Sequence, residues 1–211
     1  MSKETKHIII QCAIKLFNER GIKNVRVQDI AEAAGISPGN LTYHYRTKKD
    51  LMPTIRRYMM KKLDTMAFGN RVFEDGLEGM KVVKGYLEYL QEFRFFYLDT
   101  LEIMREYPEI RETHHSQIKL EIKSIVNLIN YTQSKEYLMP EAFDGQFEAL
   151  ANQIWMTLHF WLLNRAIKGE KDPGIEEGLM AVANLFYPHC TTFGRKKYAE
   201  LVDMIYSDAL V

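Results

Sequence analysis

Apolar residues recur along most of the chain at spacings of three and four positions, and almost no segment alternates apolar with polar residues. Side chains three or four residues apart share one face of an α-helix, whereas alternation is typical of a β-strand. The pattern predicts four helices in the first third of the chain, at about 4–20, 27–34, 38–45 and 48–67. The fold class is therefore predicted to be all-α.

The remaining residues predict a larger helical body. Its expected helices lie at about 80–90, 95–107, 118–131, 144–168, 175–187 and 195–209. The segment 144–168 carries apolar residues on several sides, so it must be covered on several sides. It is predicted to be a core helix, with or without a contact to a second subunit.

A tight turn joins the second and third predicted helices. Gly35 turns the chain, Ser37 is a good N-cap, and Pro38 stands in the first turn, where proline is tolerated. Two helices joined by a short turn with glycine form the helix-turn-helix pattern, whose second helix enters the major groove of DNA. Thr47 and Asp50 have the spacing of a capping box, which opens the fourth helix.

The net charge of zero hides an uneven distribution along the chain. Residues 1–62 hold 13 lysines and arginines against 5 acidic residues, a net charge of +8. Residues 63–211 hold the other 15 basic residues and 23 acidic residues, a net charge of −8. A basic end joined to an acidic body indicates that this end meets a polyanion.

The leading residues of the third helix suit contact with base edges. Pro38 and Gly39 open the helix, and glycine lets the backbone approach closely. Asn40 can pair with adenine at two points, and Thr42 can offer a hydroxyl or a methyl group to a base. These four residues are predicted to face the bases.

The residues that follow suit contact with phosphate. Tyrosine hydroxyls and imidazoles donate to phosphate oxygens without reading sequence, and helix N-termini attract phosphate. These properties assign Tyr43, His44 and Lys48 to the DNA backbone. Leu41 and Tyr45 lie four residues apart and are instead expected to pack against the first helix.

Residues 27–51, VQDIAEAAGISPGNLTYHYRTKKDL, resemble the signature of TetR-family transcriptional regulators. Residues 13–27, AIKLFNERGIKNVRV, are similar to that family's first helix and glycine turn, so that the match covers about residues 5–60. The resemblance implies a homodimeric, ligand-responsive repressor. It implies an N-terminal helix-turn-helix domain at 1–47 and a larger all-helical ligand-binding and dimerisation domain at 48–211, connected by the helix at 48–67.

The resemblance gives the residues of the third helix the roles already described, with two departures. Thr42 stands where the family usually has an aromatic residue. Arg26 stands where the family usually caps the second helix with Thr or Ser, which exchanges a cap worth about 1 kcal/mol for a cation beside the DNA. Gln28, in the same helical turn, completes the set assigned to DNA.

The expected partners are a near-palindromic double-stranded DNA operator, a second copy of the chain and a small-molecule effector of apolar or aromatic character. Pockets are mostly apolar with a few polar anchors, which makes six residues candidates for the pocket wall: Phe93, Phe96, Tyr97, Met104, Trp155 and His159. Aromatic residues at helical spacing are equally compatible with plain core. The dimer contact is assigned to the helix at 144–168 and a neighbour, through Ile154, Leu158, Trp161, Leu162, Val182 and Phe186.

No cofactor or metal is predicted. Glu112 and His115 have the helical spacing of a di-iron ligand pair, but such sites need two of these motifs, so His114 and His115 are expected on an exposed polar face. Cys12 and Cys190 are expected to be reduced. No apolar run approaches the roughly 20 residues of a membrane-spanning helix, and the N-terminus lacks a signal-peptide pattern, so a cytoplasmic location is expected.

Two other functions stay open. The chain could be a regulator that has no small-molecule inducer and works through protein partners. It could also be a helical-bundle metal enzyme, which would require carboxylates and histidines clustered on facing helices and would leave the charge asymmetry unexplained.

Overall fold

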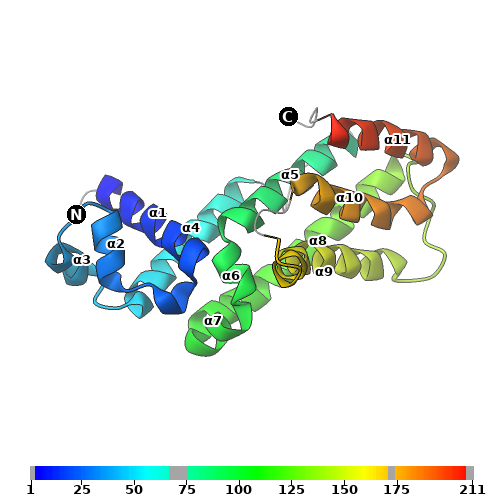
Figure 1. Cartoon of the computed structure of the whole chain (residues 1–211). Helices are drawn as coiled ribbons and strands as arrows, with labels where there is room; N and C mark the ends of the chain where they lie inside the picture. The colour runs from blue at the N-terminus through cyan, green and yellow to red at the C-terminus, as the bar shows by residue number, and fades with distance from the viewer. Residues whose placement is uncertain (1–2, 67–75, 171–173, 208–211) are drawn as a thin grey trace. The chain divides into compact units, whose positions relative to one another are not determined.

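The structure, a computed structural model, describes residues 3–66, 76–170 and 174–207 (Figure 1). Within these ranges the chain is helical and has no strand, which confirms the predicted all-α class. The elements in chain order are α1 (Lys3–Arg20), η1 (Ile22–Asn24), α2 (Val27–Ala33), α3 (Pro38–His44), α4 (Lys48–Thr65), α5 (Gly76–Glu92), α6 (Arg94–Leu98), α7 (Thr100–Glu106), α8 (Pro108–Ser134), α9 (Gln146–Ile167), α10 (Ile175–Phe186), η2 (Tyr187–His189) and α11 (Thr192–Tyr206).

Two of the expected helices differ in extent from the observed ones. The segment predicted as one helix at 95–107 is divided into α6 and α7 at Asp99, whose backbone (φ −107°, ψ 20°) leaves the helical region. The helix predicted at 118–131 begins ten residues earlier, at Pro108. Proline fits the first turn of a helix, because the amide hydrogen it lacks would have no partner there.

The chain divides into two compact units. The first comprises Met1–Thr65 and Glu92–Thr113, and the second comprises Met66–Gln91 and His114–Val211. The first unit thus contains α6 and α7 together with the predicted helix-turn-helix, although sequence position assigns these helices to the body. The functional boundary at residue 47 stays a prediction.

Local signals explain the turn between α2 and α3. Gly35 adopts a φ of 66°, which is costly for other residues, and the Ile36 N–H donates to the Ala31 carbonyl at 3.0 Å. Ser37 then caps α3 by accepting the Asn40 N–H at 3.2 Å, and Pro38 occupies the first helical position. These contacts place α3 at a fixed angle to α2, as the sequence predicts.

The side chain of Asn18 joins α1 to the α6 segment within the first unit. Its amide nitrogen donates to the Glu92 carbonyl at 2.8 Å, and its amide oxygen accepts the Phe95 N–H at 3.0 Å. The rings of Phe17 and Phe95 lie 5.4 Å apart between centroids, and both are buried. A single polar residue therefore satisfies the backbone where α6 begins, and the aromatic contact beside it adds apolar burial.

The first unit also buries a cation. Arg56 is 5% exposed, and its guanidinium carbon lies 5.0 Å from the centroid of the Phe96 ring. Among the described residues, Nε and one terminal nitrogen of Arg56 have no hydrogen-bond partner. The negative face of the ring offsets part of the cost of burying this charge.

The second unit is built around α9. Leu150, Ala151, Ile154 and Leu158 on α9 are each at most 2% exposed. The helix is covered on more than one side, as its sequence predicts, and α10 packs against both α9 and α11. A Cβ atom at Gly178 on α10 would lie 3.0 Å from the Leu87 side chain, so glycine allows α10 to approach α5 closely.

Helix α11 is fixed at its N-terminus by backbone contacts. Thr191 caps it by accepting the Gly194 N–H at 2.9 Å, and the Thr191 N–H donates to the Tyr137 carbonyl at 3.0 Å. A Cβ atom at Gly194 would lie only 1.9 Å from the Tyr137 carbonyl oxygen. The start of α11 therefore depends on the absence of a side chain at this position.

In the part of the chain that the structure describes, no helix is both long enough and apolar enough to cross a membrane.

Replacing Gly194 with alanine tests this close contact. The atoms that the added Cβ would meet belong to the backbone of Tyr137, which cannot move aside as a flexible side chain would. The free energy of unfolding should therefore fall by about 1–3 kcal/mol or more. Chemical denaturation measures the change. Gly39→Ala is the matched control, since a Cβ atom there meets nothing within 4 Å. An equal effect of the two substitutions would contradict the proposed role of Gly194.

Candidate functional site

Helix α3 has one buried side and one polar, solvent-exposed side. Leu41 is fully buried and Tyr45 is 8% exposed, as their spacing predicts. The residues predicted to face the bases lie at the surface: Pro38, Gly39 and Asn40 are exposed and Thr42 is half-buried. The two apolar anchors thus leave the opposite face of α3 open to a partner.

Thr42 uses its hydroxyl within the helix. Its Oγ1 donates to the Pro38 carbonyl at 2.9 Å, with a longer contact of 3.2 Å to the Gly39 carbonyl. In this rotamer the hydroxyl proton is not available to a base, whereas the methyl group and an oxygen lone pair remain. An apolar contact with a thymine methyl group suits this arrangement.

Tyr43 and His44 form a pair at the end of α3. Tyr43 is 83% exposed, the most exposed of the large apolar and aromatic side chains described, and its ring meets that of His44 edge-on at 4.8 Å between centroids. An exposed tyrosine gains no burial in the free chain. Its position is therefore consistent with contact to a partner.

Arg26 and Asp29 together close the N-terminus of α2. The Asp29 carboxylate accepts the Arg26 backbone N–H at 2.7 Å and pairs with the Arg26 guanidinium at 3.1 Å. These two hydrogen bonds lower the pKa of Asp29. The carboxylate of Asp29, at the third helical position, thus supplies half of a capping box. The other half is missing, because the side chain of Arg26 has no hydrogen-bond acceptor. Arg26 and Gln28 are both exposed.

Lys48 has a structural contact that the sequence does not reveal. Its ammonium group donates to the Ile22 carbonyl and lies 3.4 Å from the Lys23 carbonyl, at the end of η1. Lys48 therefore attaches the start of α4 to η1, in addition to any contact with DNA.

Two neighbouring lysines pair with carboxylates of α7. Lys23 lies 2.7 Å from Glu102, and Lys49 lies 3.6 Å from Glu106. All four side chains are substantially exposed, so each pair contributes little to stability. Sequence reasoning missed these pairs, because the two partners of each lie more than 50 residues apart.

The six candidate pocket residues are divided between the two compact units. Phe93, Phe96, Tyr97 and Met104 are at most 8% exposed and belong to the first unit. Trp155 and His159 belong to the second unit. Among the described residues, none of the six lines either of two cavities found in the second unit.

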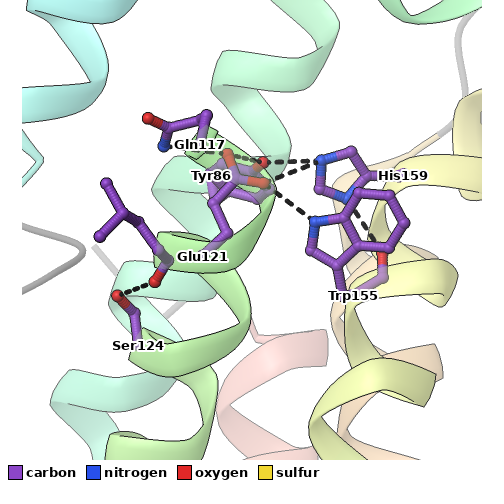
Figure 2. A network of polar contacts seen from close by, with 7 residues as sticks. Tyr86, Gln117, Glu121, Ser124, Trp155 and His159 are labelled. Atoms are coloured by element: carbon purple, nitrogen blue, oxygen red, sulfur yellow. Dashed lines mark hydrogen bonds and ion pairs between the residues drawn. The ribbon is translucent and has the colours of Figure 1, made fainter. Parts of the chain in front are cut away.

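Trp155 and His159 join a buried polar cluster instead (Figure 2). The Glu121 carboxylate, 3% exposed, accepts hydrogen bonds from Trp155 Nε1 at 2.9 Å, the Tyr86 hydroxyl at 3.0 Å and Gln117 Nε2 at 3.2 Å. His159 Nε2 lies 3.0 Å from the Tyr86 oxygen and 3.4 Å from Glu121. The cluster thus ties α5, α8 and α9 together.

The hydrogen bonds of the cluster indicate its charges. His159 Nδ1 lies 2.9 Å from the Trp155 carbonyl, which can only accept, so this nitrogen carries a proton. The Tyr86 hydroxyl donates to Glu121, and its oxygen lies 3.0 Å from His159 Nε2. Burial raises the pKa of Glu121, but the hydrogen bonds from His159, Trp155 and Gln117 outweigh it, and the pKa lies below its ordinary value.

Glu121 was not among the candidate residues. The signal was present in the sequence, because Glu121 lies four residues before Ile125 and eight before Ile129 and therefore interrupts an apolar stripe. A charged residue within such a stripe indicates a buried partner. Its partners lie on two other helices, which sequence spacing does not identify.

Most residues of the predicted dimer contact are buried within the single chain, and the assignment stays a prediction. Ile154, Leu158 and Val182 are at most 2% exposed within the single chain, so they form core and have little surface to offer. Trp161 and Leu162 are also buried, and Phe186 is half-buried and lines both cavities. The exposed apolar residues of α9 are others, namely Met156, Phe160 and Ile167.

The histidine pair and the cysteines have no metal-site geometry. His114 is 6% exposed and the adjacent His115 is exposed, so the pair does not share the exposed face that was expected. Among the described residues, no group of three or more His, Cys, Asp or Glu side chains is arranged to hold a metal ion. Cys12 and Cys190 are free thiols, and burial raises the pKa of both.

Family models match most of the chain. The model described as bacterial regulatory proteins of the tetR family matches residues 9–55, and the one described as a bacterial transcriptional repressor matches residues 57–198. An HTH-type transcriptional regulator of Staphylococcus aureus (strain USA300) is 30% identical over 94 residues, which is 44% of this chain and 49% of that protein. The chain spans about half or less of the length of the curated relatives that it matches.

Solved structures share the fold. A TetR-family regulator from Marinobacter aquaeolei VT8 superposes with a TM-score of 0.84 at 22% identity, over 97% of this chain and 99% of that one. A complex of SmeT with triclosan superposes with a TM-score of 0.59 at 14% identity, over 90% and 93%. The matched families consist of regulators and not enzymes, which removes the metal-enzyme alternative. The chain belongs to the TetR family of bacterial transcriptional regulators.

Proposed function

We propose that this regulator is a repressor that binds a near-palindromic operator as a homodimer and is released by a small molecule. The observation that carries the proposal is the division of α3 into a buried face and an exposed polar face. A homodimer would present two such helices to successive major grooves, about 34 Å apart. DNA recognition then follows from Asn40 and Gly39 at the bases and from Tyr43 and His44 at phosphates.

The exposed apolar residues of α9 support dimerisation. Met156, Phe160 and Ile167 are 48%, 56% and 78% exposed, and their spacing of four and seven residues places them on one helical face. A row of large apolar side chains on one face is typical of a protein–protein contact. We therefore place the dimer contact on this outer face of α9 and not on the buried residues of the original assignment.

An effector is supported by the family and by the second unit. SmeT, which shares the fold, is described in complex with triclosan. The second unit contains a cavity of about 320 Å³, within the usual range for small-molecule sites. A ligand would release DNA if it bound more tightly to a conformer in which the two α3 helices no longer match the groove spacing.

Asn40→Ala tests base reading. The substitution removes the proposed two-point contact of the exposed Asn40 side chain with adenine. Operator binding should therefore weaken by about 1–3 kcal/mol, and one operator position should accept other base pairs. Fluorescence anisotropy at fixed salt, with an operator selected from random duplexes and a shuffled duplex as control, measures both. Equal weakening on the two duplexes would contradict a base-reading role.

Gly39→Ala tests the close approach of α3. In the free chain the added methyl group meets nothing within 4 Å, and alanine favours a helix by about 0.5–1 kcal/mol, so stability should stay equal or rise. Operator affinity should nevertheless fall by about tenfold or more, because the methyl group would meet the DNA. Affinity that stays unchanged in this stable variant would place the start of α3 away from the duplex.

Phe160→Glu tests the dimer face. A charge at the centre of an apolar contact must be buried without a partner, so the dissociation constant of the dimer should rise roughly 100-fold. Sedimentation equilibrium measures this constant. Leu120→Glu on α8 is the matched control, because Leu120 is 60% exposed and lies outside the proposed face. A Phe160→Glu variant that dimerises like the control would move the contact elsewhere.

A further inference from the structure

The helix α11 is attached to the second unit along one side. Its Tyr198 hydroxyl donates to the Asn184 side chain of α10 at 2.6 Å, and the rings of Tyr198 and Tyr187 lie 4.7 Å apart between centroids. The contact of Gly194 with Tyr137 holds its first turn. These contacts fix α11 beside α10 and near the loop that follows α8.

The apolar face of α11 is only partly covered. Ile205 is 2% exposed, but Leu201, Val202 and Met204 are half-buried. The space beneath this face is a cavity of about 320 Å³, bounded by α5, α8, α10 and α11. The cavity opens to solvent at one side, where the exposed Lys197 and Glu200 lie.

Apolar groups form most of the cavity wall. The apolar wall includes Met80 of α5, Leu128 of α8, Leu138, Phe186 of α10 and Leu201 and Met204 of α11. Two of these are methionines, whose flexible side chains adapt to ligands of different shape. The volume corresponds to roughly ten waters of ~30 Å³ each, which suits a molecule of about ten to twenty non-hydrogen atoms.

The polar groups of the wall already have partners. The Thr132 hydroxyl donates to the Leu128 carbonyl at 2.7 Å, and the Cys190 thiol lies 3.4 Å from the Phe186 carbonyl. Lys197 pairs with Glu200 at 2.7 Å, and both residues are exposed, so they lie where the cavity meets solvent. Among the described residues of the wall, a buried ligand charge would therefore have no counter-charge deep inside, and its burial would cost several kcal/mol.

We propose that this cavity beneath α11 binds the effector, and that the effector is an uncharged, mostly apolar molecule of about ten to twenty non-hydrogen atoms. The proposal rests on the proposed function for the role of the bound molecule as effector. The wall includes Ala183 and Phe186 of α10, a helix that also packs on α9. Binding would thus act on the helix next to the proposed dimer face.

A pair of probes of similar shape tests the ligand class. 4-Phenylphenol is uncharged at neutral pH, and 4-biphenylcarboxylate is an anion of similar size. Isothermal titration should show that the wild-type chain binds the phenol roughly tenfold or more tightly than the carboxylate. Failure of the phenol to bind up to its solubility limit, or equal binding of the two probes, would overturn the proposal.

Substitutions that fill the cavity test its location. Leu201→Trp and Met204→Trp each place an indole in the cavity, and both should weaken phenol binding by about tenfold or more without lowering the unfolding midpoint. Two positions one turn apart ensure that a folding defect in one does not decide the result. Tyr206→Trp is the matched control, since Tyr206 is 71% exposed and does not line the cavity. If both filled variants still bind the phenol as tightly as the wild-type chain, the cavity beneath α11 is not the binding site.

A separate measurement distinguishes this proposal from the proposed function. The wild-type chain is titrated with operator in the absence of any probe. Operator binding together with the absence of phenol binding overturns only the cavity assignment. Absence of operator binding overturns the repressor function, whatever the probe does.

Discussion

The burial of Leu41 and Tyr45 is the constraint on which the recognition surface depends. A helix of seven residues, as α3 is, has almost no stability of its own, because nucleation costs more than so few hydrogen bonds return. Two apolar anchors on one side and a serine cap at the start hold it in place. Since the anchors fix rotation about the helix axis, they decide that Asn40 and Tyr43 face outward. Loss of either anchor would disorder the whole surface.

The cations around this surface are already engaged in the free chain. Arg26 pairs with Asp29, Lys23 with Glu102 and Lys49 with Glu106. Exposed pairs of this kind are worth about 0–1 kcal/mol and are screened by salt, so exchange for a phosphate partner costs little. The carboxylates of α7 would therefore compete with any phosphate that approached Lys23 or Lys49. The net charge of +8 over the first 62 residues overstates the charge that is available to a duplex.

The sequence predicts those structural features that depend on contacts between residues close together in the chain. The boundaries of α2 and α3 follow from Gly35, Ser37 and Pro38, whose effects act within one helical turn. The pocket and dimer residues depend on which face of α9 packs inward, and a helix that is apolar on several sides does not reveal this. Leu158 and Phe160 are equally apolar, yet the first is buried and the second is exposed. Contacts between α9, α5 and α10 decide the difference, and their partners lie far away in the chain.

In the second unit, the buried Glu121 and His159 lie away from the cavity beneath α11, because neither residue lines it. Glu121 and His159 contact each other, Tyr86, Trp155 and the backbone, so an incoming ligand would have to break these contacts. Among the described residues of the cavity beneath α11, the charged groups are the exposed Lys197 and Glu200 at its mouth. Binding there would draw on apolar burial, at about 25 cal/mol per Å² and ~0.8 kcal/mol per methylene. Such a term is non-directional, so the fit of shape and volume would select the effector more than any single polar contact.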